Sequence, residues 1–145
     1  MNHQGKPITI LLIEDDEVDR EAFQYSFEKA RIANPIHYVG DGKEALRLLR
    51  GEGCDPLSKP YMIVLDINLP RMNGHEFLDE LRKDPELKGS IVFVLTTSDS
   101  EGDKLAAYNK NVAGYMLKSR VGEQFLRLTE LFDHYWRIIE FPPPR

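Results

Sequence analysis

The sequence predicts an α/β fold in which a parallel β-sheet is covered by helices on both faces. Two observations support this prediction. Five apolar segments recur along the 145-residue chain, and each is followed by a segment with the signals of a helix. Three of the apolar segments are continuous aliphatic runs without alternation, which is typical of strands buried on both faces. Because strands alternate with helices, neighbouring strands are expected to pair in parallel through helical crossovers.

Each expected strand is recognised by its apolar run. We expect the strands at residues 8–13, 36–39, 61–65, 91–95 and 113–117. The first run, Ile-Thr-Ile-Leu-Leu-Ile, is rich in β-branched and aliphatic side chains, and the third and fourth runs repeat this pattern. The second and fifth runs are shorter candidates.

The expected helices have start and stop signals. We interpret the acidic residues Asp16, Glu17 and Asp19 as compensation for the dipole of a first helix. Three further helices are expected to begin at residues 41–44, 73–74 and 100–103. In each, a residue typical of helix caps precedes apolar residues at helical spacing: Asp41, Asn73 and Ser100. A long last helix is expected at residues 120–141. The proline-rich tail, residues 142–145, cannot continue it.

Composition excludes several classes of function. With 19 basic and 24 acidic residues the net charge is −5, which argues against nucleic acid as a main partner because phosphates select a basic surface. Cys54 is the only cysteine, so neither an intramolecular disulfide nor a thiolate zinc cluster can form. The sequence has no signal peptide and no apolar run of membrane-spanning length. We therefore expect a single cytoplasmic domain, residues 1–145, that does not contact a membrane.

Charged and hydroxyl side chains follow the expected strands at the edge where open parallel sheets bind ligands. Glu14 and Asp15 follow the first strand, Asp66 the third, Thr96 the fourth and Lys118 the fifth. Clustered carboxylates repel one another unless a cation joins them, and oxygen ligands suit Mg²⁺ or Mn²⁺. Asp66 ends a buried run, where an unpaired carboxylate is costly, so we interpret it as functional. A carboxylate can accept a phosphoryl group, with a metal ion and a lysine neutralising the transferred charge.

Four motifs together resemble the receiver domain of two-component response regulators. They are Leu-Leu-Ile-Glu-Asp-Asp at 11–16, Val-Leu-Asp-Ile-Asn-Leu-Pro-Arg-Met-Asn-Gly at 64–74, Val-Leu-Thr-Thr at 94–97 and Gly-Tyr-Met-Leu-Lys at 114–118. The resemblance extends over residues 7–139. It implies a flavodoxin-like, doubly wound (βα)5 fold with strand order 2-1-3-4-5, a core at residues 7–119 and an extended C-terminal helix.

The resemblance also implies a role for each matching residue. Asp66 would be the phosphoacceptor, and Lys118 would bind the phosphoryl group. Thr96 and Tyr115 would form the switch pair that responds to phosphorylation. The implied metal ligands are Glu14, Asp15, Asp66 and the backbone carbonyl of Asn68. Such a protein is a stoichiometric phosphoacceptor rather than an enzyme, and only self-phosphorylation from small donors and autodephosphorylation are expected.

One position after the last motif departs from the family pattern. Lys118 is followed by Ser119, where the family usually has a proline in a cis peptide bond. We expect a trans bond, because a cis bond before a non-proline residue costs about 2.5–4 kcal/mol. The Lys-Ser pair, the Leu-Thr-Thr-Ser run at 95–98 and the loop at 51–60 resemble single-domain regulators that serve bacterial and cyanobacterial phytochrome histidine kinases.

That resemblance implies a phytochrome histidine kinase as partner. After Lys118 the sequence offers one helix and a tail, so we expect a stand-alone regulator whose output is a protein contact made by the domain itself. A phosphorelay sink without further output is an alternative.

Other protein classes share parts of this chemistry. A haloacid-dehalogenase-type phosphatase also uses a nucleophilic aspartate with Mg²⁺. In such a phosphatase the nucleophile follows the first strand, and a second acid stands two residues after the nucleophile. Here the candidate nucleophile Asp66 follows the third strand, and Asn68 stands in the place of the second acid. A flavodoxin-type carrier is disfavoured because the acidic loop at 14–17 would repel a phosphate. An EF-hand is excluded by Arg20 and Ser26, which stand where glycine and glutamate are required.

The last helix predicts an interaction surface. Its apolar residues spread over an arc of about 160°, wider than the roughly 100° that an ordinary surface helix needs. We expect this helix to extend beyond the sheet by roughly two turns. The overhang would expose Tyr135, Trp136, Ile138 and Ile139, and the contact residues expected on this surface are Phe132, Tyr135, Trp136 and Ile139. A second copy is expected to cover this surface in a two-fold homodimer through the fourth helix, the fifth strand and this last helix, and the alternative is that the tail folds back over it.

Overall fold

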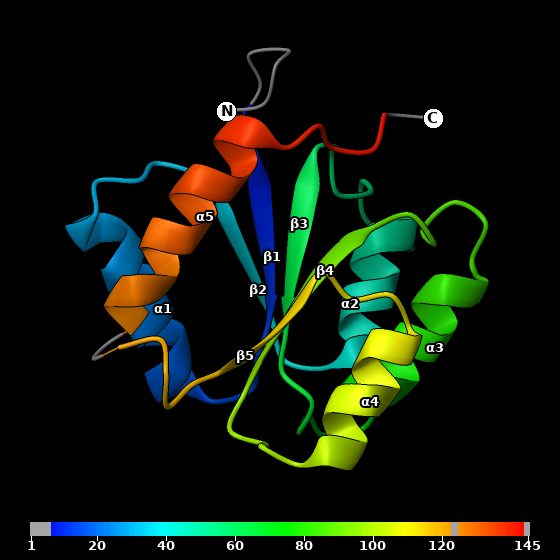
Figure 1. Cartoon of the computed structure of the whole chain (residues 1–145). Coiled ribbons are helices and arrows are strands. Elements are labelled where there is room, and N and C mark those ends of the chain that lie inside the picture. The colour runs from blue at the N-terminus through cyan, green and yellow to red at the C-terminus, as the bar shows by residue number, and fades with distance from the viewer. Residues whose placement is uncertain (1–6, 123–124, 144–145) are drawn as a thin grey trace.

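Strands and helices alternate along the computed structural model, which describes residues 7–122 and 125–143 (Figure 1). The elements are β1 (Thr9–Ile13), α1 (Glu17–Lys29), β2 (Ile36–Val39), α2 (Gly42–Arg50), β3 (Tyr61–Leu65), α3 (Gly74–Lys83), β4 (Ile91–Thr96), α4 (Glu101–Asn109), β5 (Gly114–Leu117) and α5 (Leu126–Ile138). Asp41, Asn73 and Ser100 each cap a helix through the side chain, as their positions predicted, and Asp16 caps α1 in the same way. No helix among the described residues has both the length and the apolarity needed to cross a membrane.

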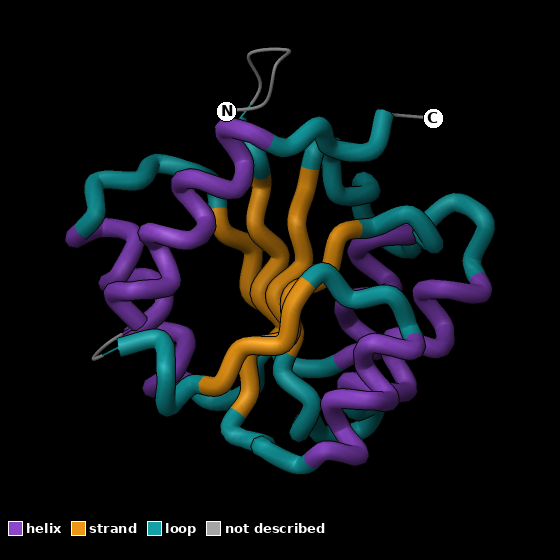
Figure 2. The backbone as a smooth tube through the Cα atoms, in the orientation of Figure 1, coloured by secondary structure: helices purple, strands orange, loops and turns teal. Residues whose placement is uncertain are grey.

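The strands form one parallel sheet in the order β2-β1-β3-β4-β5, which confirms the predicted topology (Figure 2). Ile13 of β1 pairs with Leu65 of β3, and Thr96 of β4 pairs with Leu117 of β5. These pairings place the carboxyl ends of the four strands at the same edge. The chain leaves β1 toward β2 and returns to β3 on the other side, and open parallel sheets bind ligands at such a reversal, beyond the carboxyl ends of the strands.

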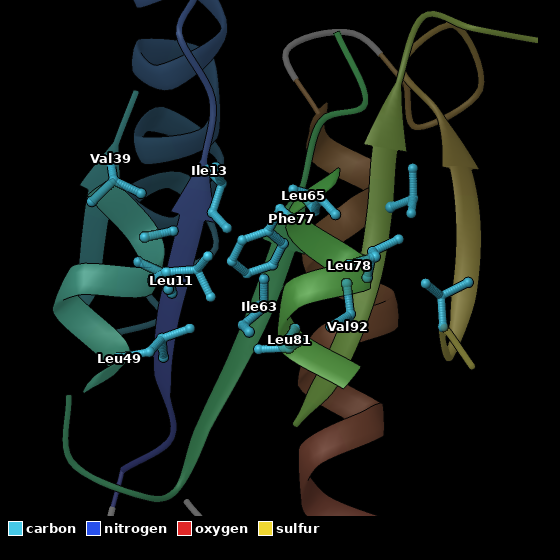
Figure 3. Close-up of a cluster of buried hydrophobic side chains, with 14 of the residues drawn as sticks. Leu11, Ile13, Val39, Leu49, Ile63, Leu65, Phe77, Leu78, Leu81 and Val92 are labelled. Carbon is cyan, nitrogen blue, oxygen red and sulfur yellow. The ribbon is translucent and has the colours of Figure 1, made fainter. Parts of the chain in front are cut away.

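Helices cover both faces of the sheet, as the alternation predicted. In Figure 1, α1 and α5 lie on one side and α2, α3 and α4 on the other. Successive side chains of β1 point to opposite faces. Leu11 and Ile13 join the core cluster beneath α2 and α3, where the ring of Phe77 packs among them (Figure 3). Ile10 and Leu12 join the second cluster, beneath α1 and α5.

The prediction of a long last helix at residues 120–141 is wrong. Gly122 (φ 84°) and Phe125 (φ 58°) hold left-handed backbone conformations, which a right-handed helix cannot include. Consequently α5 begins at Leu126 and ends at Ile138, with the same 13 residues as α1. Such a helix is about 20 Å long, comparable to a strand of five or six residues, so the expected two-turn overhang is absent from the described residues.

The predicted apolar surface on the last helix is wrong in two of its four residues. Phe132 and Trp136 are 0% and 2% exposed within a single copy of the chain. The ring of Phe132 packs edge-on against the ring of Phe93 in β4, with the two ring centroids 5.4 Å apart. The ring centroids of Trp136 and of Phe27 in α1 are 6.2 Å apart. The apolar arc is wide because α5 contacts the sheet and a neighbouring helix at once.

The other two residues are half-buried rather than open. Tyr135 lies between the rings of Phe93 and Phe141, at centroid distances of 5.1 and 6.1 Å. Phe141 comes from the segment after α5, so this segment covers Tyr135, although in Figure 1 it then runs away from the helix rather than back over it. Ile139 is half-buried as well, and Ile138 is exposed. A homodimer through the last helix stays a prediction, without Phe132 and Trp136 as contact residues.

The start of α3 packs directly against the residues that follow β3. Asn73 and Glu76 form a capping box, in which each side chain accepts a hydrogen bond from the other's backbone N–H. The N–H of Gly74 donates to the carbonyl of Ile67 at 2.9 Å. A Cβ on Gly74 would lie 2.6 Å from the carbonyl oxygen of Asp66 and 2.8 Å from the Cα of Ile67. Glycine at this position therefore allows the close approach that fixes the backbone of Asp66.

We expect Gly74→Ala to destabilise the protein by about 1–3 kcal/mol, because the added methyl group must push the backbone of Asp66 and Ile67 away. The matched control is Gly102→Ala in α4, where the nearest heavy atom to an added Cβ is 3.5 Å away. That change should be neutral or stabilising, by up to about 1 kcal/mol, since alanine favours helix. Urea denaturation measures both free energies of unfolding. Equal values for the two variants would contradict the close contact at Gly74.

Candidate functional site

The carboxyl ends of β1, β3 and β5 bring three charged side chains into contact. Glu14 follows β1, Asp66 follows β3 and Lys118 follows β5. The Lys118 Nζ lies 2.6 Å from Glu14 Oε1 and 3.0 Å from Asp66 Oδ2. In sequence, Lys118 is separated from these partners by 104 and 52 residues. The sheet topology therefore assembles the cluster that the strand ends predicted.

Three carboxylates in this cluster lie close enough to share one cation. Glu14, Asp15 and Asp66 each offer an oxygen atom, and these oxygens lie within 4.8 Å of one another. Glu14 and Asp66 are buried, whereas Asp15 is exposed and opens the group to solvent. Hard oxygen ligands with one open side fit Mg²⁺ or Mn²⁺, which keep part of their water shell.

Burial and ion pairing shift the pKa values of the clustered side chains in opposite directions. Desolvation raises the pKa of Glu14 to about 7, with a further increase from the charge of Asp66, although the hydrogen bond from Lys118 opposes the rise. Burial by itself would lower the pKa of Lys118. Hydrogen bonds to Asp19 and Glu14 and the charge of Asp66 outweigh it, so that the pKa of Lys118 is raised above its ordinary value. The lysine is therefore a permanent cation among carboxylates.

Asn68 lies next to the candidate phosphoacceptor. Its backbone N–H donates to Asp66 Oδ1 at 3.3 Å, two residues away along the chain. This bond places the backbone of Asn68 at the rim of the carboxylate cluster. Its carbonyl as a metal ligand stays a prediction.

The predicted switch residues are joined through the backbone of a residue that the sequence analysis did not single out. Thr96 is fully buried at the end of β4, and its Oγ1 accepts a hydrogen bond from the N–H of Ser98 at 3.3 Å. The hydroxyl of Tyr115 on β5 donates to the carbonyl of Ser98 at 2.9 Å. Ser98 Oγ donates to Asp103 Oδ2 of α4 at 2.5 Å, and Asp103 Oδ1 lies 2.8 Å from His75 Nε2 of α3. Ser98 thus connects the ends of β4 and β5 to two helices.

Asp19 belongs to the site, although its position in the sequence suggested only helix-dipole compensation. Its Oδ2 lies 2.5 Å from Lys118 Nζ. Asp16 has the capping role, since its side chain accepts from the N–H groups of Val18 and Asp19. Acidic residues are common in the first turn of a helix, so the position of Asp19 in the sequence gave little indication that it contacts the lysine.

The peptide bond after the lysine is trans, as expected from the absence of proline. Among the described residues only Lys59–Pro60 is cis. The N–H of Lys118 donates to the carbonyl of Thr96 at 2.9 Å, which ties the lysine to the end of β4. Ser119 therefore accommodates the lysine without the cis geometry that is usual in the family.

Comparisons with known proteins agree with this arrangement. A model of the response regulator receiver domain matches residues 10–129. The probable methanogenesis regulatory protein FilR2 of Methanothrix harundinacea is 35% identical over 130 residues, which cover 90% of this chain and 84% of that protein. Response regulator Rcp1 of Synechocystis sp. is 34% identical over 136 residues, which cover 93% and 92% of the two chains.

Solved structures show the same likeness. The phosphorylated cyanobacterial phytochrome response regulator RcpA matches with a TM-score of 0.85 at 33% identity, covering 95% of this chain and 100% of that one. The Mn²⁺-bound form of Rcp1 matches with a TM-score of 0.80 at 30% identity, covering 94% and 100%. Family match, strand order and the carboxylate–lysine cluster agree, and this chain belongs to the response regulator receiver domain family.

Proposed function

We propose that this chain is a stand-alone response regulator that accepts a phosphoryl group from a histidine kinase on Asp66. The observation that supports this most directly is the contact of 3.0 Å between Asp66 Oδ2 and Lys118 Nζ, made by a carboxylate that is only 7% exposed. A buried carboxylate of this kind, beside a cation and two further acids, is a frequent mark of a functional site. The match covers 92% of Rcp1 and all of the RcpA chain, which supports the same kind of regulator.

The transfer itself needs few groups. An Asp66 oxygen attacks the phosphorus of a phosphohistidine. The O–P bond forms as the P–N bond breaks, and the electron pair stays on the imidazole, which takes up a proton. Lys118 lies beside the attacked position and stabilises the charge of the phosphoryl oxygens. Glu14, Asp15, Asp66 and the carbonyl of Asn68 would hold Mg²⁺, or Mn²⁺ in its place. When bound, the ion neutralises further negative charge.

The output is proposed to start at Ser98. Its N–H donates to Thr96 and its carbonyl accepts from Tyr115, so one backbone unit bridges both switch residues. If the Thr96 hydroxyl turns toward a phosphoryl group on Asp66, the bond from Ser98 is lost. The loop between β4 and α4 is then free to move, and Tyr115 and the start of α4 at Asp103 respond.

A phytochrome histidine kinase is the proposed phosphoryl donor, acting in the cytoplasm. RcpA is described as a cyanobacterial phytochrome response regulator, and the bacteriophytochrome response regulator RtBRR matches this chain at 30% identity with a TM-score of 0.75. In this proposal the protein accepts one phosphoryl group and does not turn over a substrate, whereas an aspartate-based phosphatase would.

We expect Asp66→Asn to abolish labelling of the protein by radioactive acetyl phosphate with Mg²⁺, because the amide is a poor nucleophile. The control is Asp55→Asn, an exposed carboxylate in the loop before β3, which should label as the wild type does. The label should be released by hydroxylamine, as an acyl phosphate is. Undiminished labelling of Asp66→Asn would contradict the assignment. Sustained hydrolysis of an added phosphate ester would favour the phosphatase instead.

Removing the charge of Asp15 should weaken Mg²⁺ binding by about tenfold or more, since a direct ligand is lost. Phosphorylation should slow in parallel. The matched variants are Asp15→Asn and Asp16→Asn, which remove one charge each from adjacent exposed positions. Asp16→Asn keeps the helix cap, because asparagine caps as well as aspartate. Magnesium titration by calorimetry measures both, and equal affinities would show that Asp15 is not a ligand.

We expect Tyr115→Phe to leave labelling of Asp66 unchanged and to loosen the loop at Ser98, because it removes the hydrogen bond to that carbonyl. In NMR spectra of the unphosphorylated variant, the amide signals of Ser98 and Asp103 should shift toward their phosphorylated positions. Tyr108→Phe, on the exposed face of α4, is the control and should cause no such shift. Unmoved signals in Tyr115→Phe would contradict the coupling.

A further inference from the structure

Lys118 has no hydrogen-bond donor left for a phosphoryl group. A lysine ammonium carries three N–H donors. Its Nζ lies 2.6 Å from Glu14, 2.5 Å from Asp19 and 3.0 Å from Asp66. The lysine side chain is only 9% exposed, so water has little access to it. A phosphoryl oxygen can reach Lys118 only if one of these carboxylates gives up its contact.

Asp19 differs from the other two partners of the lysine. Glu14 and Asp66, with Asp15, form the group whose oxygens lie within 4.8 Å of one another, and Asp19 stands outside that group. It comes from the first turn of α1, where its N–H is held by the capping carboxylate of Asp16 at 3.2 Å. Its side chain is 26% exposed. Asp19 is therefore a carboxylate on the capped first turn of α1 that contacts the lysine without belonging to the metal group.

We propose that Asp19 is a positioning residue of the phosphoacceptor site, which holds Lys118 in a resting contact that the phosphoryl group must displace. This inference rests on the proposed roles of Asp66 and Lys118 and deepens them. Asp19 acts through Lys118 and touches no reacting atom.

The charge of Asp19 has opposite effects on the two ligands of the site. It attracts a divalent cation, and it offsets part of the positive charge that Lys118 places beside Glu14 and Asp66. The same charge repels an anionic phosphoryl group and occupies the lysine that should bind it. Removing the charge therefore weakens metal binding and strengthens binding of the phosphoryl group. A residue that only stabilises the fold would change both affinities in the same direction.

The experiment compares two variants of the whole chain that remove one charge each from the first turn of α1. Asp19→Asn keeps the size of the side chain and an oxygen acceptor for Lys118. Glu17→Gln removes an exposed charge from the same turn and leaves the lysine contacts intact. Mn²⁺ affinity is measured from the EPR signal of the free ion. Affinity for beryllofluoride, a mimic of the acyl-phosphate group, is measured by ¹⁹F NMR at saturating Mg²⁺.

We expect Asp19→Asn to weaken Mn²⁺ binding and to tighten beryllofluoride binding, each by about three- to tenfold, as removal of one nearby charge predicts. Asp19→Ala should give the same two signs. Glu17→Gln should change both affinities by less than about twofold, because an exposed charge is screened. Thermal unfolding of each variant verifies that the fold is retained.

Two outcomes would overturn the proposal while Asp66 keeps its role. In the first, Asp19→Asn behaves as Glu17→Gln does, which would reduce Asp19 to a helix-dipole charge. Alternatively, both affinities fall together in Asp19→Asn and Asp19→Ala, which would make Asp19 a structural residue. A wild-type protein that does not bind beryllofluoride would instead overturn the function proposed for Asp66, and the role of Asp19 with it.

Discussion

The ammonium of Lys118 allows two carboxylates to lie side by side away from water. Glu14 and Asp66 are 3% and 7% exposed, and an isolated charge at such depth costs several kcal/mol. The lysine meets both at hydrogen-bond distance, so each carboxylate has a partner of opposite charge. This contact requires the ends of β1, β3 and β5 to share one edge, which parallel pairing in the order β2-β1-β3-β4-β5 provides. The contacts of Lys118 with Glu14 and Asp66 therefore depend on the strand order of the sheet.

The two sides of the site are built with different rigidity. On the side of β3, Gly74 packs on the backbone of Asp66 and a capping box fixes the start of α3, so the candidate phosphoacceptor cannot shift easily. On the side of β4, Thr96 and Tyr115 are joined through the backbone of Ser98 by two hydrogen bonds. A few hydrogen bonds of this kind cost little to exchange. The architecture thus combines a closely packed Asp66 with a loop that is held by a few hydrogen bonds.

The last helix shows how a pattern on one element can mislead. Its wide apolar arc suggested an exposed surface, yet Phe132 and Trp136 are buried because α5 packs on the sheet and on α1 together. Phe141 covers part of what remains by lying against Tyr135. An arc measured on an isolated helix reports how much apolar surface must be covered. It does not report whether a neighbouring helix, the chain's own tail or another molecule covers it.

From the sequence by itself, local physical chemistry predicted the strands, most of the helix starts and the residues that meet at the sheet edge. Apolar runs, three of them unbroken and aliphatic, predicted the five strands. Capping residues predicted where α2 to α4 begin, and the strand ends predicted the meeting of Asp66 with Lys118. The strand order followed from the resemblance of four motifs to a known family rather than from periodicity. Only the tertiary structure decided the start of α5, because the left-handed conformation of Phe125 directly before it has no local sequence signal, although Gly122 is a residue that favours such a conformation. It also decided the contact between Asp19 and Lys118, which lie 99 residues apart and meet because packing orients α1 against the sheet edge.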